Sequence, residues 1–162
     1  MTFPFLVAKA LAAKASLAMA IAASALLPLA PALARNFDFK SIGASPAVLY
    51  DAPSLKGGKL YIAPQGMPVE VVLSYGEWVK VRDASGDMAW TEAKLLSPRR
   101  MVVVRSANAK IRPTPDESGI PLMSADKGVL LELADPGVAQ WVKVRHKDGI
   151  IGYVKAIDIW GI

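Results

Sequence analysis

The chain has 162 residues, a formal net charge of +5, 53% hydrophobic residues and no cysteine. The lack of cysteine excludes disulfides and thiol chemistry. A single histidine argues against a conventional zinc site and against a Ser-His-Asp triad.

The apolar excess is concentrated at the N-terminus. Two lysines precede an apolar run over residues 15–27, two prolines end that run, and small residues follow at Ala32 and Ala34. This order predicts a secretory signal peptide over residues 1–34, cleaved after Ala34, and therefore a periplasmic or secreted protein. The alternative is an uncleaved membrane anchor, because residues 15–34 are just long enough to span a bilayer. The many alanines and the two prolines favour cleavage.

Cleavage would also lower the charge. The removed segment holds two lysines and no acidic residue, so 17 basic and 14 acidic residues would remain, a net charge of +3. This charge is too small to indicate nucleic-acid binding. It fits a weak attraction to anionic cell-wall polymers, or a merely soluble surface.

The remaining sequence contains one unit twice. The stretch Trp78-Val79-Lys80-Val81-Arg82 recurs 63 positions later, beginning at Trp141, and upstream residues recur at an offset of 62. The extra residue of the second copy lies within 134–138, a turn-like segment where an insertion is tolerated. We assign residues 35–97 to copy one and residues 98–162 to copy two.

Alternating apolar residues and frequent turn signals predict short strands. In copy one we expect an edge strand at the start, an apolar piece at 48–50, a hairpin turn at 83–86 and a single 3₁₀ turn over 92–96. The other strands expected in this copy cover 60–62, 69–73, 78–82 and 88–91. Copy two repeats the scheme, with turns at 112–115, 126–128, 135–137 and 147–149. The sequence therefore predicts an all-β protein with a small barrel or sandwich in each copy.

The ionisable residues give no clear catalytic pattern. The one histidine, His146, lies in a predicted hairpin turn. Seven aspartates also fall in predicted turns, where their carboxylates cap backbone N–H groups; they are Asp51, Asp83, Asp87, Asp116, Asp126, Asp135 and Asp148. No glycine-rich loop opens a helix, so no nucleotide site is indicated. We expect no catalytic residue, no metal and no cofactor. The alternative that stays open is a catalytic pair formed by two carboxylates that converge in the fold.

The order of motifs resembles the bacterial SH3-like domain family, most closely in copy two. The motifs are Ile111-Arg112-Pro113-Thr114-Pro115, Lys127-Gly128, the Trp141–Arg145 strand, and Gly149 to Val154. Copy one departs from the pattern at Leu49-Tyr50-Asp51 and at Ala89-Trp90-Thr91. The resemblance implies two tandem half-open β-barrels of about five strands each. It also implies non-catalytic binding of cell-wall peptide, or attachment to a cell-wall enzyme.

Aromatic side chains are the candidate ligand-binding residues, because aromatic-lined grooves bind extended peptides by stacking. Those in copy one are Tyr50, Trp78 and Trp90, and those assigned as counterparts in copy two are Trp141, Tyr153 and Trp160. The alternative is that the aromatic residues pack into the small cores or between the two units. The basic residues on the same strand faces are either solvated or bind an anionic ligand; they are Lys80, Arg82, Lys143 and Arg145.

These observations favour a non-catalytic, exported binding module that recognises peptidoglycan or a periplasmic protein. Two alternatives stay open: a cell-wall hydrolase that uses a carboxylate pair, and a purely structural envelope module whose grooves are filled by the neighbouring barrel. We expect no nucleic-acid partner and no stable membrane span after signal cleavage.

Overall fold

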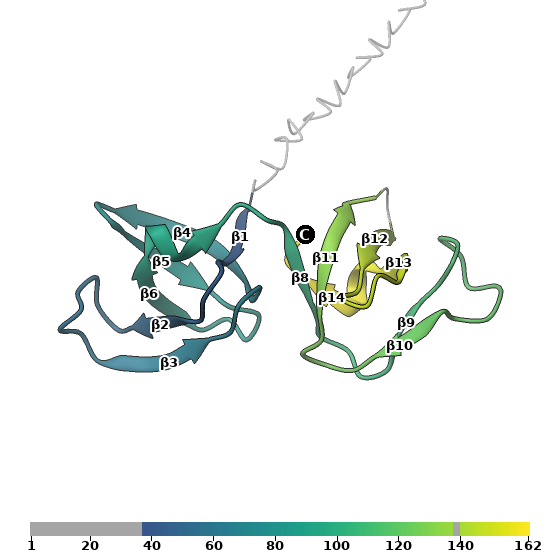
Figure 1. Ribbon diagram of the computed structural model, residues 1–162, viewed down its shortest axis with the longest axis horizontal. Coiled ribbons are helices and arrows are strands. Elements are labelled where there is room, and N and C mark those ends of the chain that lie inside the picture. Colours follow the sequence, from purple (N-terminus) through teal and green to yellow (C-terminus); the bar gives the residue numbers. More distant parts are fainter. Residues whose placement is uncertain (1–36, 138–139) are drawn as a thin grey trace, which may run out of the picture. The chain divides into compact units, whose positions relative to one another are not determined.

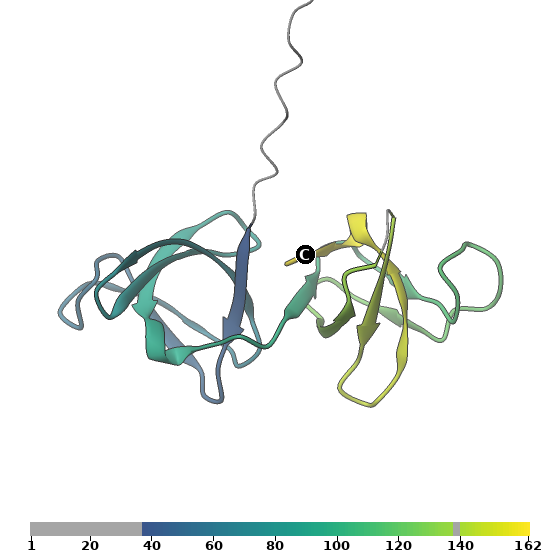
Figure 2. The same ribbon diagram turned by 90° about the horizontal axis from the view of Figure 1, so that it is seen from above.

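The computed structural model describes residues 37–137 and 140–162 (Figure 1). The predicted signal segment, residues 1–34, lies outside the described residues. The described part contains β-strands and two 3₁₀ turns, and all its paired strands are antiparallel. The all-β prediction is confirmed. Figures 1 and 2 show that the strands of each copy curve around an interior.

Copy one forms one sheet of seven strands in the order β3-β2-β6-β5-β4-β1-β7. The strands are β1 (Asp38–Ile42), β2 (Ala47–Tyr50), β3 (Lys59–Ala63), β4 (Pro68–Tyr75), β5 (Trp78–Arg82), β6 (Met88–Glu92) and β7 (Leu96–Ser97). The predicted 3₁₀ turn is present as η1, Ala93–Leu95.

Copy two forms a five-stranded sheet, in the order β13-β12-β11-β8-β14, and a separate pair, β10-β9. The elements are β8 (Met101–Val104), β9 (Ala109–Ile111), β10 (Met123–Ala125), β11 (Leu130–Asp135), β12 (Trp141–Arg145), β13 (Ile151–Lys155), the 3₁₀ turn η2 (Ala156–Asp158) and β14 (Ile159–Trp160). Each copy has seven strands, more than the about five that the family resemblance implies. In copy one, six of the seven lie where the sequence predicts strands. The seventh, β7, has only two residues and is too short to leave a hydrophobic pattern.

The repeated strand pairs in the same way in both copies. Val79 lies opposite Thr91 in the β5–β6 hairpin, and Val142 lies opposite Val154 in the β12–β13 hairpin. Both pairs are related by the 63-residue offset, so the duplication seen in the sequence is also a duplication of strand register.

Strict alternation along β5 and β12 separates a core face from an outward face. In β5, Val79 and Val81 are buried, whereas Trp78, Lys80 and Arg82 are partly exposed, as the sequence predicts. Each copy has a core of its own, built from such inward side chains. That of copy one contains Ile42, Leu49, Val69, Val79 and Val81, and that of copy two contains Val102, Ile111, Leu131, Val142, Val144 and Val154.

One polar side chain lies within the core of copy one. Thr91 is 0% exposed, and its hydroxyl group has no hydrogen-bond partner. Its counterpart in copy two is Val154, which is equally buried and has nearly the same shape. A buried hydroxyl group that lacks a partner loses its hydration without compensation, which costs free energy.

We therefore expect Thr91→Val to raise the free energy of unfolding by about 1 kcal/mol. The reverse change in copy two, Val154→Thr, should lower it by about 1–3 kcal/mol, because it buries a new hydroxyl group. Urea unfolding followed by tryptophan fluorescence measures both effects. A loss of stability in Thr91→Val would show that the hydroxyl group makes a stabilising bond.

Candidate ligand-binding site

Three strands of copy one bring its predicted aromatic residues together. Tyr50 on β2 lies opposite Trp90 on β6 in the sheet. The Tyr50 and Trp78 rings are in edge-to-face contact, with centroids 5.6 Å apart and planes at 84°. We call Tyr50, Trp78 and Trp90 the aromatic face of copy one. Contacts of this kind between aromatic rings stabilise their mutual orientation.

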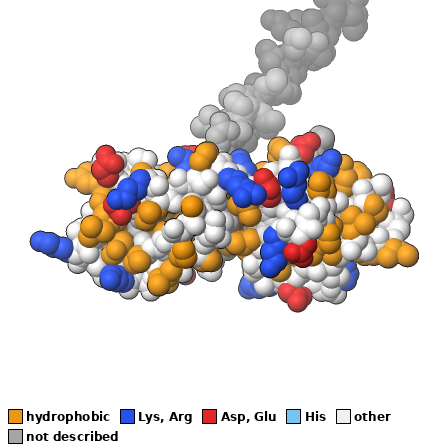
Figure 3. Space-filling model, in the orientation of Figure 1, with side chains coloured by type: hydrophobic (Ala, Val, Ile, Leu, Met, Phe, Trp, Pro, Cys, Tyr) orange, Lys and Arg blue, Asp and Glu red, His pale blue; other side chains and the backbone are white. Residues whose placement is uncertain are grey.

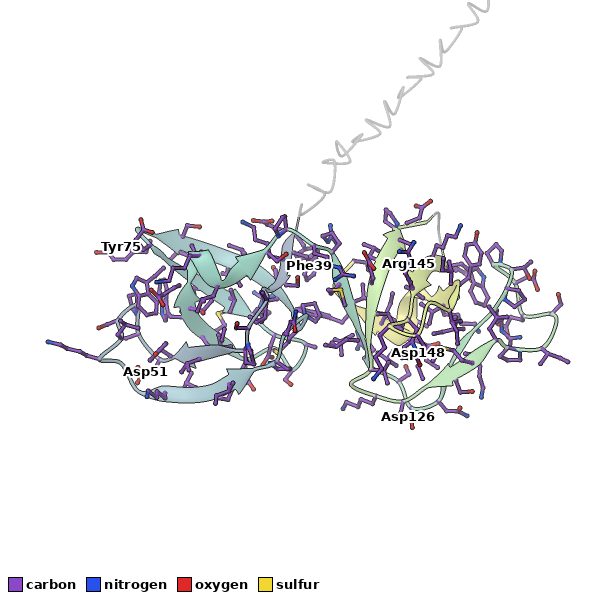
Figure 4. All side chains as sticks on the ribbon, viewed as in Figure 1. Phe39, Asp51, Tyr75, Asp126, Arg145 and Asp148 are labelled. Carbon is purple, nitrogen blue, oxygen red and sulfur yellow. The ribbon has the colours of Figure 1, made fainter. Side chains whose placement is uncertain are left out.

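The aromatic face is held at both ends by local turns. Directly after Tyr50, the Asp51 carboxylate accepts a hydrogen bond from the Gly58 N–H at 2.7 Å, and the Asp51 N–H donates to the Gly58 carbonyl at 3.0 Å. At the other end, Tyr75 closes the β4–β5 hairpin opposite Trp78. Figure 4 shows Asp51 in the loop after β2 and Tyr75 at the tip of β4.

The three aromatic residues are exposed to different degrees. Tyr50 is only 8% exposed, so most of its ring packs against its neighbours. Trp78 and Trp90 are half-buried and keep part of their surface accessible. The Lys80 ammonium group lies 5.9 Å from the centroid of the Trp90 ring, which is within the range of a cation–π contact. Copy one thus presents two partly accessible indoles and one cation.

In copy two, Trp141 and Tyr153 lie on the neighbouring strands β12 and β13, and both are half-buried. Each ring has a lysine beside it. The Lys155 ammonium group is 5.9 Å from the Trp141 centroid, and the Lys143 ammonium group is 5.9 Å from the Tyr153 centroid. Trp160 lies on β14, at the opposite edge of this sheet from β13, so the structure does not bring it together with the other two.

The structural counterpart of Tyr50 in copy two is Arg112, which reasoning from aromatic residues alone missed. Arg112 and Tyr153 exchange two backbone hydrogen bonds, each of 2.8 Å. This pairing matches the pairing of Tyr50 with Trp90 in copy one. The signal that could have found Arg112 was the repeat register, because it lies 62 positions after Tyr50.

The outward charges differ between the copies. Arg82 forms an ion pair of 3.4 Å with Glu70, whereas its counterpart Arg145 is exposed. On the face drawn in Figure 3, basic and acidic side chains are interspersed among hydrophobic ones.

Several aspartates cap turns, as predicted from the sequence. The Asp83 carboxylate accepts backbone N–H bonds from Ser85 and Asp87, at 2.9 and 3.1 Å. The carboxylates of Asp51, Asp116 and Asp135 also accept bonds from backbone N–H groups. His146 lies in the β12–β13 turn, with Nδ1 3.3 Å from the Asp148 carboxylate.

Three carboxyl groups of copy two have pKa values below their usual range. Hydrogen bonds from Ser118 lower the pKa of Asp116, and those from Lys155 and Arg99 lower the pKa values of Glu117 and Glu132 respectively. A general acid needs the opposite shift. Within residues 37–137 and 140–162, no group of three or more metal-ligating side chains is present, and no helix is long and apolar enough to cross a membrane.

Both copies match the same family model. The model, described as "Bacterial SH3 domain", matches residues 43–98 and 103–161. No curated protein matches the chain. Among solved structures, the chain is similar to NlpC2 and NlpC1 from Trichomonas vaginalis, with 12% and 13% sequence identity and a TM-score of 0.35 for each. Each similarity covers 76% of this chain, and the chain spans only 48% and 45% of those proteins.

Proposed function

The chain belongs to the bacterial SH3 domain family, and from this membership we propose that it is a non-catalytic, exported module that binds cell-wall peptide. The proposed location is the periplasm or the outside of the cell, on the strength of the N-terminal signal pattern. There the proposed ligand is directly accessible.

The observation that carries the proposal is the aromatic face. In copy one, Trp78 and Trp90 keep accessible surface while Tyr50 fixes the orientation of Trp78 by edge-to-face packing. Rings held in this way bind a ligand at low entropic cost, because they do not have to be ordered on binding. Indoles beside a lysine suit an extended peptide that carries both apolar groups and carboxylates.

Four turn carboxylates of the described residues have structural rather than catalytic positions. A hydrolase would need a carboxyl group with a raised pKa in a cleft. Asp51, Asp83, Asp116 and Asp135 are instead engaged with backbone N–H groups of their own turns. These groups have a structural role that accounts for their positions.

Co-sedimentation with isolated peptidoglycan sacculi tests the proposal. We expect saturable binding by the wild-type protein, and a loss of affinity of at least about tenfold in a Trp90→Ala/Tyr153→Ala double variant, because stacking on aromatic rings is lost in both copies. Ile62→Ala is a matched control, since Ile62 is 68% exposed and lies outside the aromatic face. Circular dichroism checks that each variant is folded.

Two results would contradict the proposal. A wild-type protein that does not co-sediment is not a wall binder, and the search would move to periplasmic protein partners. Equal binding by the folded double variant and the wild type would remove the aromatic face from the binding mechanism.

A further inference from the structure

A small cavity of about 210 Å³ lies within copy two, beside Trp141. Its lining contains five charged side chains: Lys110, Arg112, Glu117, Lys155 and Asp158. Ligand pockets for drug-sized molecules are typically about 300–1,000 Å³. The cavity is therefore large enough for only a small group, such as a single amino acid or the end of a peptide.

The fold does not require most of these charges, because copy one builds the same strands with an uncharged residue at four of the five positions. The indole is shared, since Trp141 corresponds to Trp78. At the positions of the five charged residues, copy one has Val48, Tyr50, Leu55, Glu92 and Leu95, in the order given above. The spacing between the paired strands is also the same, because Leu49 pairs with Tyr61 as Ile111 pairs with Met123. The charges of Lys110, Arg112 and Asp158 are absent from the equivalent fold and form no ion pair among the described residues, so they point to a ligand rather than to stability.

Two cations of the cavity form no direct ion pair among the described residues. The Lys110 ammonium group donates to the Asn108 side-chain oxygen at 2.7 Å and to the Ser124 hydroxyl at 2.8 Å. The Arg112 guanidinium donates to the Gly119 carbonyl at 2.9 Å. All three acceptors are neutral, so neither cation is bonded directly to a carboxylate. Arg112 does lie close enough to Asp116 and Glu117 to add to the lowering of their pKa values by hydrogen bonds from Ser118 and Lys155. An arginine fork and a neighbouring lysine bind carboxylate or phosphate groups, and of these a cell-wall peptide carries the carboxylate.

The other charges include one acid that is free to meet a ligand. Lys155 and Glu117 form an ion pair of 2.5 Å and largely neutralise each other. Asp158 forms no ion pair within the part of the chain that the structure describes. The cavity thus combines two cations and one carboxylate that form no direct ion pair within the described residues, together with the indole of Trp141. This set matches a ligand with a carboxylate, an ammonium group and a short apolar body.

We propose that the cavity of copy two binds a zwitterionic amino acid or the end of a short peptide. Lys110 and Arg112 bind its carboxylate, Asp158 binds its ammonium group, and Trp141 contacts its apolar part. The inference rests on the proposed function and names the ligand class for one of the two copies. Copy one, with Val48, Tyr50 and Leu95 at the corresponding positions, takes a less charged part of a ligand.

Titration of the ¹⁵N-labelled full chain with three peptides tests the charge requirement. Trialanine carries both charges, N-acetyl-trialanine lacks the ammonium group, and trialanine amide lacks the carboxylate. We expect trialanine to shift the amide signals of residues 107–112 and 155–158, and each blocked peptide to bind at least about tenfold more weakly, because one charge-assisted contact is lost. Equal binding of trialanine and its amide overturns the proposal, and so does the absence of binding by all three.

Variants that carry the residue of copy one provide a second test. Arg112→Tyr and Lys110→Val should weaken trialanine binding about tenfold or more while leaving the binding of the amide unchanged. Asp158→Leu should reduce the preference for trialanine over its N-acetylated form. Lys147→Ala is the charge-matched control, since it removes an exposed lysine that does not line the cavity. Unchanged affinities in folded Arg112→Tyr would refute the assignment. If this variant does not fold, the titrations of the wild-type protein with the three peptides remain the test.

The two proposals fail in different ways. Binding to sacculi that persists in Lys110→Val and Arg112→Tyr, without any binding of trialanine, leaves wall recognition intact and removes the zwitterion site. Binding of trialanine in the cavity, without co-sedimentation of the wild-type protein, would keep the zwitterion site and remove wall recognition.

Discussion

Replacing Asp83 by alanine is expected to lower the free energy of unfolding of copy one by about 2–4 kcal/mol. The Asp83 side chain is only 8% exposed and accepts three hydrogen bonds. Two come from the N–H groups of Ser85 and Asp87, and one comes from the Tyr61 hydroxyl at 2.7 Å. These bonds join the β5–β6 turn to β3, and alanine would leave all three donors without a partner. Urea unfolding measures the loss, and an unchanged midpoint would contradict it.

The Tyr61→Phe variant separates two contributions to stability: the hydrogen bond from β3 to Asp83, and the hydrogen bonds within the turn. It keeps the two backbone bonds to Asp83 and removes only the phenol, so a smaller loss of about 1 kcal/mol is expected. Burial raises the pKa of Tyr61, and the hydrogen bond to Asp83 raises it further. The raised pKa means that the fold favours the neutral phenol. Its stabilising contribution is therefore complete below the unfolded pKa of about 10 and is lost as the pH rises beyond it.

The pH dependence follows directly. The wild type should be more stable than Tyr61→Phe at neutral pH, and this difference should shrink above pH about 10, where only the wild type has a phenol to ionise at this position. Denaturant midpoints of both proteins across the alkaline range measure the difference. A constant difference at every pH would show that Tyr61 does not donate to Asp83.

Gly152→Ala is the second substitution with a large expected effect, a loss of about 2–3 kcal/mol in copy two. A Cβ atom on Gly152 would lie 2.6 Å from the Arg112 carbonyl oxygen and 2.7 Å from a methyl carbon of Ile111. Both distances are too short, and the first involves backbone, which yields less easily than a side chain. The strain would fall on the two hydrogen bonds between Arg112 and Tyr153, so binding at the cavity should weaken as well.

Ala89→Gly is the matched control for Gly152→Ala. Ala89 is the counterpart of Gly152, and it is 2% exposed in copy one. Removal of its methyl group should cost only about 0.5–1 kcal/mol, mainly through the greater freedom of the unfolded chain. Thermal unfolding compares the two variants. If both variants show an equally small loss of stability, the close approach of β9 to β13 at Gly152 does not constrain copy two.

Much of the fold follows from local pattern. The alternation in Trp78–Arg82 predicts which residues face the core, and the structure buries Val79 and Val81. The turn around Asp83 and the 3₁₀ turn after β6 also lie where the sequence places them. These features depend on residues close together in the chain, so a single sequence is enough to reveal them.

The candidate site is predicted only in part. Tyr50, Trp78 and Trp90 do share one face, but Trp160 is a counterpart by residue type alone and not by its position in the sheet. β14 lies at the edge of the sheet away from β13, which separates Trp160 from Tyr153. The position equivalent to Tyr50 holds Arg112, and a search for aromatic residues passes over an arginine.

Periodicity and internal repetition are enough to show that the described chain is a duplicated all-β unit, and which face of each repeated strand points inward. Which outward residues meet depends instead on the packing of the whole fold. Lys110, Glu117, Trp141 and Asp158 line one cavity although they are spread over 49 residue positions. Their meeting depends on which strands and turns are neighbours in space. That neighbourhood is set by burial of the whole core, and no local pattern encodes it.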